Sequence, residues 1–202
     1  MIWVPVVFVS ILVHEMGHAL MIRQFGWWPS ILLYTFGGLA IYQATHRDPR
    51  KQMLISFAGP LAGFCLAAAV VIALRAAGHP LTFRSGGPFG FQIEREGFKN
   101  VNLDLLVDFL LFVNIAWGLI NLLPVYPLDG GQFLYALLDS VRVPDALVKS
   151  LWVSIVTATA VAIYAVARMH DFYLAAMFGY LAFTSFQTLQ AHSSRGGGYG
   201  RW

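Results

Sequence analysis

The feature that most constrains this chain is a set of apolar runs long enough to cross a lipid bilayer. A helix needs about 20 mainly apolar residues to do so. Four runs reach that length and a fifth comes near it: Met1–Arg23, Gln52–Arg75, Leu103–Leu123, Ala146–Arg168 and Phe172–Leu189. Charged residues make up only 11% of the sequence, against about 25% in soluble domains. We therefore predict an all-α polytopic membrane protein with about five transmembrane helices.

The segment between the first two runs is too short to span. It reads ILLYTFGGLAIYQ from Ile31 to Gln43, with Gly37 and Gly38 near its middle. Aromatic and β-branched residues flank the glycine pair, which favours two short strands. Non-helical backbone is tolerated at membrane depth only where protein or a water-filled cavity covers it. We expect a re-entrant β-hairpin here.

The polar sequence is concentrated between the runs and at the end of the chain. Residues 76–100 form the main polar loop, and residues 193–202 read SSRGGGYGRW. We expect one domain over residues 1–192, followed by a flexible tail over residues 193–202. The basic residues do not follow one aromatic-studded face, so nucleic-acid binding is not expected.

The positions of Lys and Arg predict the orientation of the helices. If the spans alternate in direction, eight of the 13 basic residues fall on the side that the first run reaches at its end. They are Arg23, Arg47, Arg50, Lys51, Arg142, Lys149, Arg195 and Arg201. Cytoplasmic loops carry the excess of Lys and Arg in membrane proteins. This side is therefore expected to be cytoplasmic, in a multi-pass protein of the cell membrane.

Three ionisable residues interrupt the first apolar run. The stretch VHEMGHAL contains His14, Glu15 and His18, and each such side chain costs roughly 2.5 to 3.5 kcal/mol at the bilayer centre. Residues i and i+4 share a helix face, so the two imidazoles can bind one ion while Glu15 reaches a water molecule on it. This is the HExxH arrangement of zinc hydrolases. The alternative is two core histidines and a glutamate satisfied by its neighbours.

A catalytic zinc site usually has a third protein ligand. The best candidate is Asp129 in NLLPVYPLDGGQ, a stretch in which Pro124 and Pro127 interrupt the helix and Gly130 and Gly131 permit close backbone approach. An unwound segment with one carboxylate at membrane depth suits a metal ligand. The alternative is a turn at a helix end, with Asp129 as the N-cap of the next helix.

Together these motifs resemble the site-2 protease family of intramembrane zinc metalloproteases, including its sporulation-protease branch. The family pattern N-x-x-P-x-x-P-L-D-G is matched at every position from Asn121 to Gly130. FGG at residues 36–38 and SFAGPLAG at residues 56–63 are also similar to the family. Family members often have another span before HExxH. Here thirteen residues precede His14, as expected for a minimal core or for a start site placed too far downstream.

The resemblance implies a role for each matched residue. His14, His18 and Asp129 would bind one Zn²⁺ per chain, and Glu15 would activate a water molecule. Asn121 would hold the substrate backbone or the developing oxyanion. The segment with Gly37 and Gly38 would present the substrate as an extended strand.

The implied function is that of an intramembrane zinc metalloendopeptidase that cleaves transmembrane segments of membrane-anchored proteins, as in regulated intramembrane proteolysis. The expected partners are the substrate, the lipid bilayer and a regulatory membrane protein. His14 lies roughly 20 Å along the first helix, which predicts an active site nearer the cytoplasmic face. A catalytically silent metal-binding regulator would be expected to have lost Glu15 or a ligand, and a transporter to show repeated halves. The sequence has neither feature.

Other polar residues have simpler interpretations. Asp104 and Asp108 lie at the start of the third run, where carboxylates complement the helix dipole. Asn114 lies two helical turns before Asn121, a spacing that allows both to face one cavity. His79 falls in a loop and is expected to be solvated.

Overall fold

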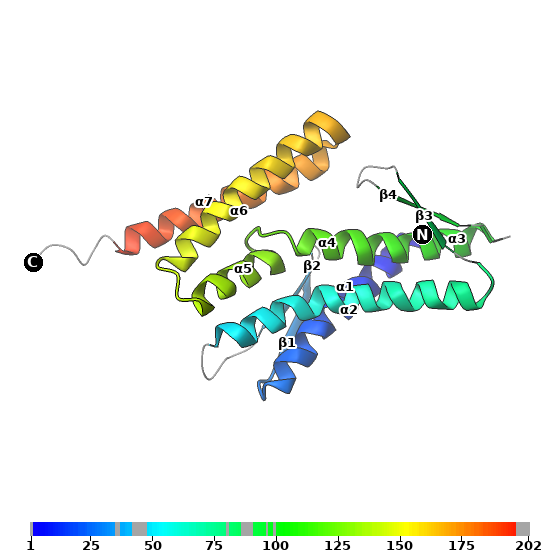
Figure 1. Cartoon of the computed structure of the whole chain (residues 1–202), viewed down its shortest axis with the longest axis horizontal. Helices are drawn as coiled ribbons and strands as arrows, with labels where there is room; N and C mark the ends of the chain where they lie inside the picture. The colour runs from blue at the N-terminus through cyan, green and yellow to red at the C-terminus, as the bar shows by residue number, and fades with distance from the viewer. Residues whose placement is uncertain are drawn as a thin grey trace, which may run out of the picture. The chain divides into compact units, whose positions relative to one another are not determined.

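The computed structural model describes residues 2–34, 37–41, 48–79, 81–85, 91–95, 97–98 and 100–196. It is mostly helical, with two short β-hairpins (Figure 1). The elements are α1 (Trp3–Gln24), β1 (Ser30–Tyr34), β2 (Gly37–Ile41), α2 (Pro49–Ala76), β3 (Leu81–Ser85), β4 (Phe91–Arg95), α3 (Val101–Phe112), the π-helix η1 (Val113–Trp117), α4 (Gly118–Asn121), α5 (Asp129–Ser140), α6 (Ala146–Tyr164), the π-helix η2 (Ala165–Met169) and α7 (Phe172–Gly196).

Four helices in the described part of the chain are long and apolar enough to cross a membrane. They cover Trp3–Gln24, Pro49–Ala76, Val101–Asn121 and Ala146–Met169. Their ends lie within three residues of those expected from the first four apolar runs. The fifth run is helical in α7, but α7 is not one of these four helices, so a fifth crossing stays a prediction.

The chain forms two compact units. The first comprises Met1–Thr45 and Ala58–Ile120, and the second His46–Phe57 and Asn121–Trp202, so α2 contributes residues to both. The single domain expected over residues 1–192 stays a prediction. Of the expected tail, residues 193–196 end α7 and residues 197–202 lie outside the described residues.

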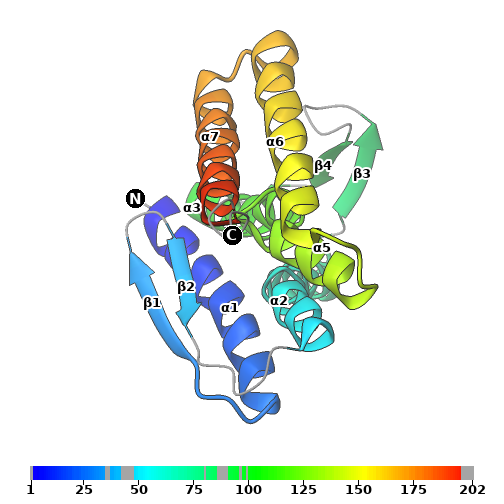
Figure 2. The same cartoon turned by 90° about the vertical axis from the view of Figure 1, so that its left-hand side faces the viewer.

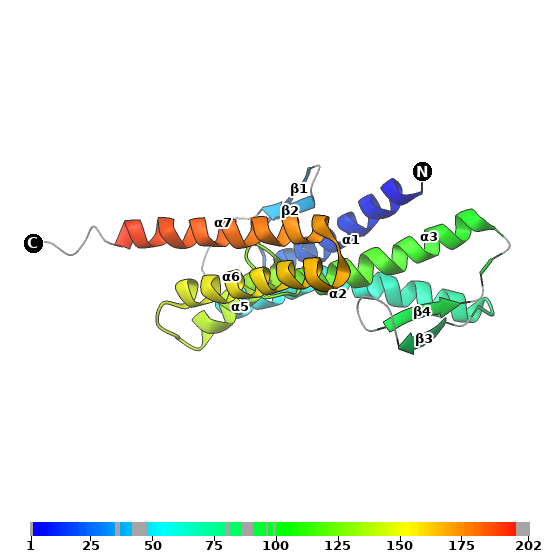
Figure 3. The ribbon, with the colours of Figure 1, turned by 90° about the horizontal axis from the view of Figure 1, so that it is seen from above.

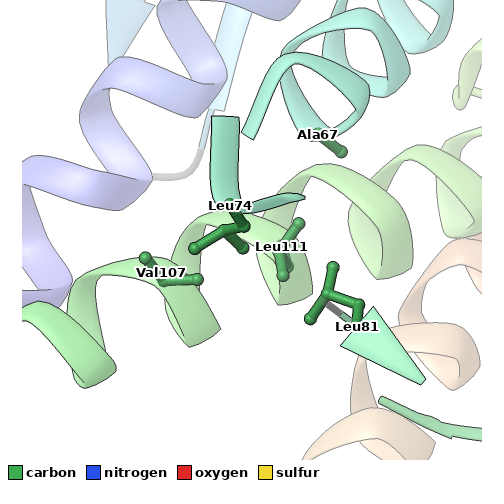
Figure 4. Packing of buried hydrophobic residues seen from close by; sticks show 5 residues of the cluster. All are labelled: Ala67, Leu74, Leu81, Val107 and Leu111. Atoms are coloured by element: carbon green, nitrogen blue, oxygen red, sulfur yellow. The ribbon is translucent and has the colours of Figure 1, made fainter. Parts of the chain in front are cut away.

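The first unit is built on close packing of α1, α2 and α3. Gly17 of α1 lies against the Ala58 carbonyl oxygen of α2, so that a methyl group at Gly17 would collide with it. Small residues at helix contacts let backbones approach closely, as is common between membrane helices. Apolar side chains of α2, β3 and α3 form a buried cluster (Figure 4). Its members are Ala67, Leu74, Leu81, Val107 and Leu111.

The predicted hairpin is present as two antiparallel strands. Ser30 of β1 pairs with Ile41 of β2, and Tyr34 pairs with Gly37. Both strands lie beside α1 (Figure 2). Gly37 and Gly38 therefore lie within β2, which begins at Gly37, and not between the strands. That the hairpin enters the membrane stays a prediction.

The second unit contains the helices that follow the Pro-rich stretch. The helix before it ends at Asn121 and α5 begins at Asp129, so the predicted helix break is present. The helix α5 packs against α6, and α6 and α7 run side by side along most of their length (Figure 3).

Candidate metal centre

The two histidines of HEMGH lie on one buried face of α1. The Nε2 atoms of His14 and His18 are 3.1 Å apart, and the ring planes are inclined by 78°. A tetrahedral ion bound at about 2.0–2.1 Å from each nitrogen requires a separation of about 3.4 Å. Two neutral imidazoles that share one N–H···N hydrogen bond also fit this distance. Both rings thus aim Nε2 at one point, where a metal ion or a proton can lie between them.

A glycine of α2 forms the wall next to these nitrogens. A Cβ atom at Gly59 would overlap His18 Nε2 and would lie 2.8 Å from His14 Nε2. Any other residue would therefore fill the space at the two imidazoles. Gly59 belongs to the stretch SFAGPLAG, which resembles the site-2 protease family but does not by itself predict a role for this position. The residues present fit a bound ion because the glycine keeps that space open.

The acidic residue of HEMGH is also buried. Glu15 follows His14 on α1 and is only 6% exposed. A carboxylate is rarely so buried unless it is paired or binds a metal ion. Its burial next to two histidines is typical of a functional group.

A second polar pair lies one turn before His14. Asn114 Nδ2 donates to Ser10 Oγ at 2.9 Å and to the Leu110 carbonyl oxygen at 2.8 Å, and both polar side chains are buried. Asn114 belongs to η1, and π-helical turns occur frequently at functional sites. The structure pairs Asn114 with Ser10 of α1, and a cavity shared with Asn121 stays a prediction.

Two further expected site residues, Asn121 and Asp129, belong to the second unit. Asn121 is buried at the end of α4, and Asp129 is half-buried as the first residue of α5. The N-cap position is Leu128, so the alternative interpretation of Asp129 as the N-cap does not hold. A Cβ atom at Gly130 would overlap the carbonyl oxygens of Leu122 and Leu123. The glycine therefore permits α5 to start directly on the Pro-rich segment.

Comparison with known proteins identifies the family of the chain. The model of Peptidase family M50 matches residues 3–163, which include all of the site residues above. The chain belongs to peptidase family M50. The resemblance to the site-2 proteases is thereby confirmed.

Several known proteins are similar in sequence to this chain. Rip3 from Mycobacterium tuberculosis is 33% identical over 140 residues, covering 66% of this chain and 31% of that protein. Zinc metalloprotease MJ0392 from Methanocaldococcus jannaschii is 29% identical over 133 residues, covering 65% of this chain and 33% of that protein. Stage IV sporulation protein FB from Bacillus subtilis is 29% identical over 130 residues, covering 63% of this chain and 37% of that protein. The aligned part thus spans about a third of each relative.

A solved structure shares the fold. The site-2 protease from Methanocaldococcus jannaschii aligns with a TM-score of 0.55 at 23% identity, covering 92% of this chain and 76% of that one. This M50 chain therefore has a site-2 protease-like fold. The catalytic and ligand roles of His14, Glu15, His18, Asn121 and Asp129 stay predictions.

Proposed function

We propose that this M50 protein is an intramembrane zinc metalloendopeptidase. The observation that carries the proposal is the buried pair of imidazoles, 3.1 Å apart, with Glu15 on the same membrane-spanning helix. A bilayer-spanning helix would not bury three ionisable groups without a function for them. Membership of family M50 and the name zinc metalloprotease of the relative MJ0392 support the same activity.

His14, His18 and Asp129 would hold the ion, one Zn²⁺ per chain. Support comes from the chemistry of this candidate group, which offers two imidazole nitrogens and one carboxylate oxygen. Such a donor set is typical of catalytic zinc and leaves a position for water. A zinc ion bound by these residues would make that water acidic enough to lose a proton near neutral pH.

Two other side chains would carry the proton and the developing charge. Glu15 would accept the proton of the attacking water on a carboxylate oxygen, and would later give it to the leaving amine nitrogen. The Asn121 amide would donate a hydrogen bond to the carbonyl oxygen of the scissile peptide as that oxygen gains negative charge. Both side chains are buried, and electrostatic interactions are stronger away from bulk water.

The substrate would be a membrane-anchored protein cleaved within its transmembrane segment. Helical peptide groups are hydrogen-bonded to each other, so the segment must unwind before its carbonyl can be attacked. The β1–β2 hairpin, with Gly37 and Gly38 in β2, would enter the membrane and pair with the unwound segment through main-chain hydrogen bonds. The active site would lie nearer the cytoplasmic face, α7 would add a fifth crossing, and a membrane partner would control access.

The test is cleavage of a tagged transmembrane reporter by the purified protein. We expect Glu15→Gln to lower kcat by about 100- to 10,000-fold with the zinc content unchanged, because the variant loses the base and keeps the ligands. Asp108→Asn, which changes an exposed carboxylate on α3, serves as the control. Normal cleavage by Glu15→Gln would overturn the assignment of the base.

A further inference from the structure

The Pro-rich segment between Asn121 and Asp129 has lost the regular hydrogen bonds of a helix. Its main chain must therefore find other partners, since unpaired backbone groups are costly at membrane depth. Several of these groups pair within the segment or with the first turn of α5. The bonds run from Val125 N to Leu123 O (2.7 Å), from Leu128 N to Val125 O (2.8 Å), from Gly131 N to Leu128 O (3.0 Å) and from Gln132 Nε2 to Pro127 O (3.2 Å).

Two serines from later helices bind the main chain at Tyr126. The Tyr126 N–H donates to Ser154 Oγ of α6 at 3.0 Å, and Ser185 Oγ of α7 donates to the Tyr126 carbonyl oxygen at 3.0 Å. Both serines are completely buried, with 0% of the side chain exposed. The helices α6 and α7 run side by side (Figure 3), and each contributes one serine that bonds the main chain of Tyr126.

The hydrogen-bond roles of the two hydroxyls are fixed by their surroundings. Ser154 Oγ donates to the Ser150 carbonyl oxygen of its own helix at 2.8 Å, which leaves its lone pairs to accept the Tyr126 N–H. Ser185 Oγ has the opposite role, because its hydroxyl donates to the Tyr126 carbonyl oxygen. Neither role can be taken over by an apolar side chain.

We infer that Ser154 and Ser185 are positioning residues for Asp129 and act through the Tyr126 main chain; this inference rests on the proposed function. Asp129 follows Tyr126 by three residues. A Cβ atom at Gly131 would lie 2.5 Å from Tyr126 N, so the first turn of α5 lies directly against the held residue. Holding Tyr126 thus fixes the start of α5 and its first carboxylate. Ser185 lies beyond residues 3–163, the part matched by the family model.

The test compares Ser154→Ala and Ser185→Ala with two matched controls. Ser150→Ala removes a buried hydroxyl of α6 that bonds only the Leu147 carbonyl of its own helix among the described contacts. Thr188→Val removes the hydroxyl of a half-buried residue on α7, where it bonds the Thr184 carbonyl. Each control removes one side-chain bond from the same helix and leaves Tyr126 held.

Three measurements on the full chain in detergent test whether Ser154 and Ser185 position Asp129. We expect each serine variant to exchange the amide protons of the Pro-rich segment about tenfold faster than wild type, because the Tyr126 main chain loses one of its two hydrogen bonds to the serines. We also expect about tenfold faster loss of zinc to a chelator, and a lower kcat for the reporter with KM unchanged. The controls should match wild type in all three.

Serine variants that behave like their controls would overturn the inference. A thermal unfolding curve for each variant separates loss of the whole fold from loss of the local hydrogen bond. If Ser154→Ala does not fold, Ser185→Ala still tests the inference, because it removes only the bond to the Tyr126 carbonyl and keeps the bond to the Tyr126 N–H. Failure of wild type to hold zinc would contradict the proposed function instead. Amide exchange would then still decide whether the two serines hold the segment.

Discussion

The imidazole nitrogens of His14 and His18 meet against Gly59, because α2 presents a residue without a side chain at that point. A methyl group there would overlap the His18 ring, and at least one imidazole would have to move. The position of Gly59 therefore decides whether the two nitrogens can share one ion.

Gly59→Ala should abolish most zinc binding and lower the free energy of unfolding by about 1–3 kcal/mol, the usual cost of overpacking. Gly63→Ala is the matched control on the same helix, since its Cβ would meet Asn114 Oδ1 at an ordinary 3.4 Å. Zinc content by elemental analysis and thermal unfolding in detergent report the two effects. Full zinc occupancy in Gly59→Ala would show that the wall of the site lies elsewhere.

Asp129→Asn should weaken zinc binding by about 100-fold or more, because an amide replaces the only carboxylate among the three proposed ligands. The helix α5 offers its own control in Asp139→Asn, which changes a carboxylate in the last turn of the same helix. Competition with a zinc-binding dye measures the affinity. Equal affinities for the two variants would remove Asp129 from the ligand set.

Asn121→Ala should lower kcat by about 100- to 1,000-fold and leave zinc content and KM nearly unchanged. The amide is proposed to donate a hydrogen bond that forms fully only when the carbonyl oxygen becomes negative. Steady-state kinetics with the reporter separate kcat from KM. The control is Asn102→Ala, which removes an exposed amide on α3. A change in KM alone for Asn121→Ala would contradict the oxyanion role and indicate that Asn121 only binds substrate.

The buried pair of Ser10 and Asn114 predicts a coupling between α1 and η1. Removing either partner should lower the free energy of unfolding by about 1–3 kcal/mol, because the other polar group stays buried without it. The free energy of unfolding of the double variant Ser10→Ala/Asn114→Leu should fall by less than the sum of the losses in the two single variants. A double-mutant cycle of thermal unfolding measures the difference, and strictly additive losses would argue against the pairing.

Much of the fold could be predicted from the sequence because its signals are local. The four long apolar helices follow from run length, and the shared face of His14 and His18 follows from the i, i+4 spacing. The helix break follows from Pro124 and Pro127. The family follows from two motifs whose residues carry the proposed chemistry.

The unpredicted features depend on contacts between distant segments. Single serines in apolar helices, such as Ser154 and Ser185, carry no pattern that reveals what they bind. The same holds for Gly59, whose importance depends on what it faces. The expectation that His79 is solvated was wrong: it is half-buried, and its ring packs against Phe98 with a centroid separation of 4.4 Å.

Zinc K-edge X-ray absorption on the purified wild-type protein tests the central claim most directly. We predict one zinc ion per chain, bound by two imidazole nitrogens and by oxygen atoms at about 2.0–2.2 Å. His14→Gln should lose that signal, whereas His170→Gln, an exposed histidine, should keep it. A preparation that cleaves the reporter without stoichiometric zinc, or whose zinc lacks imidazole ligands, would contradict the account.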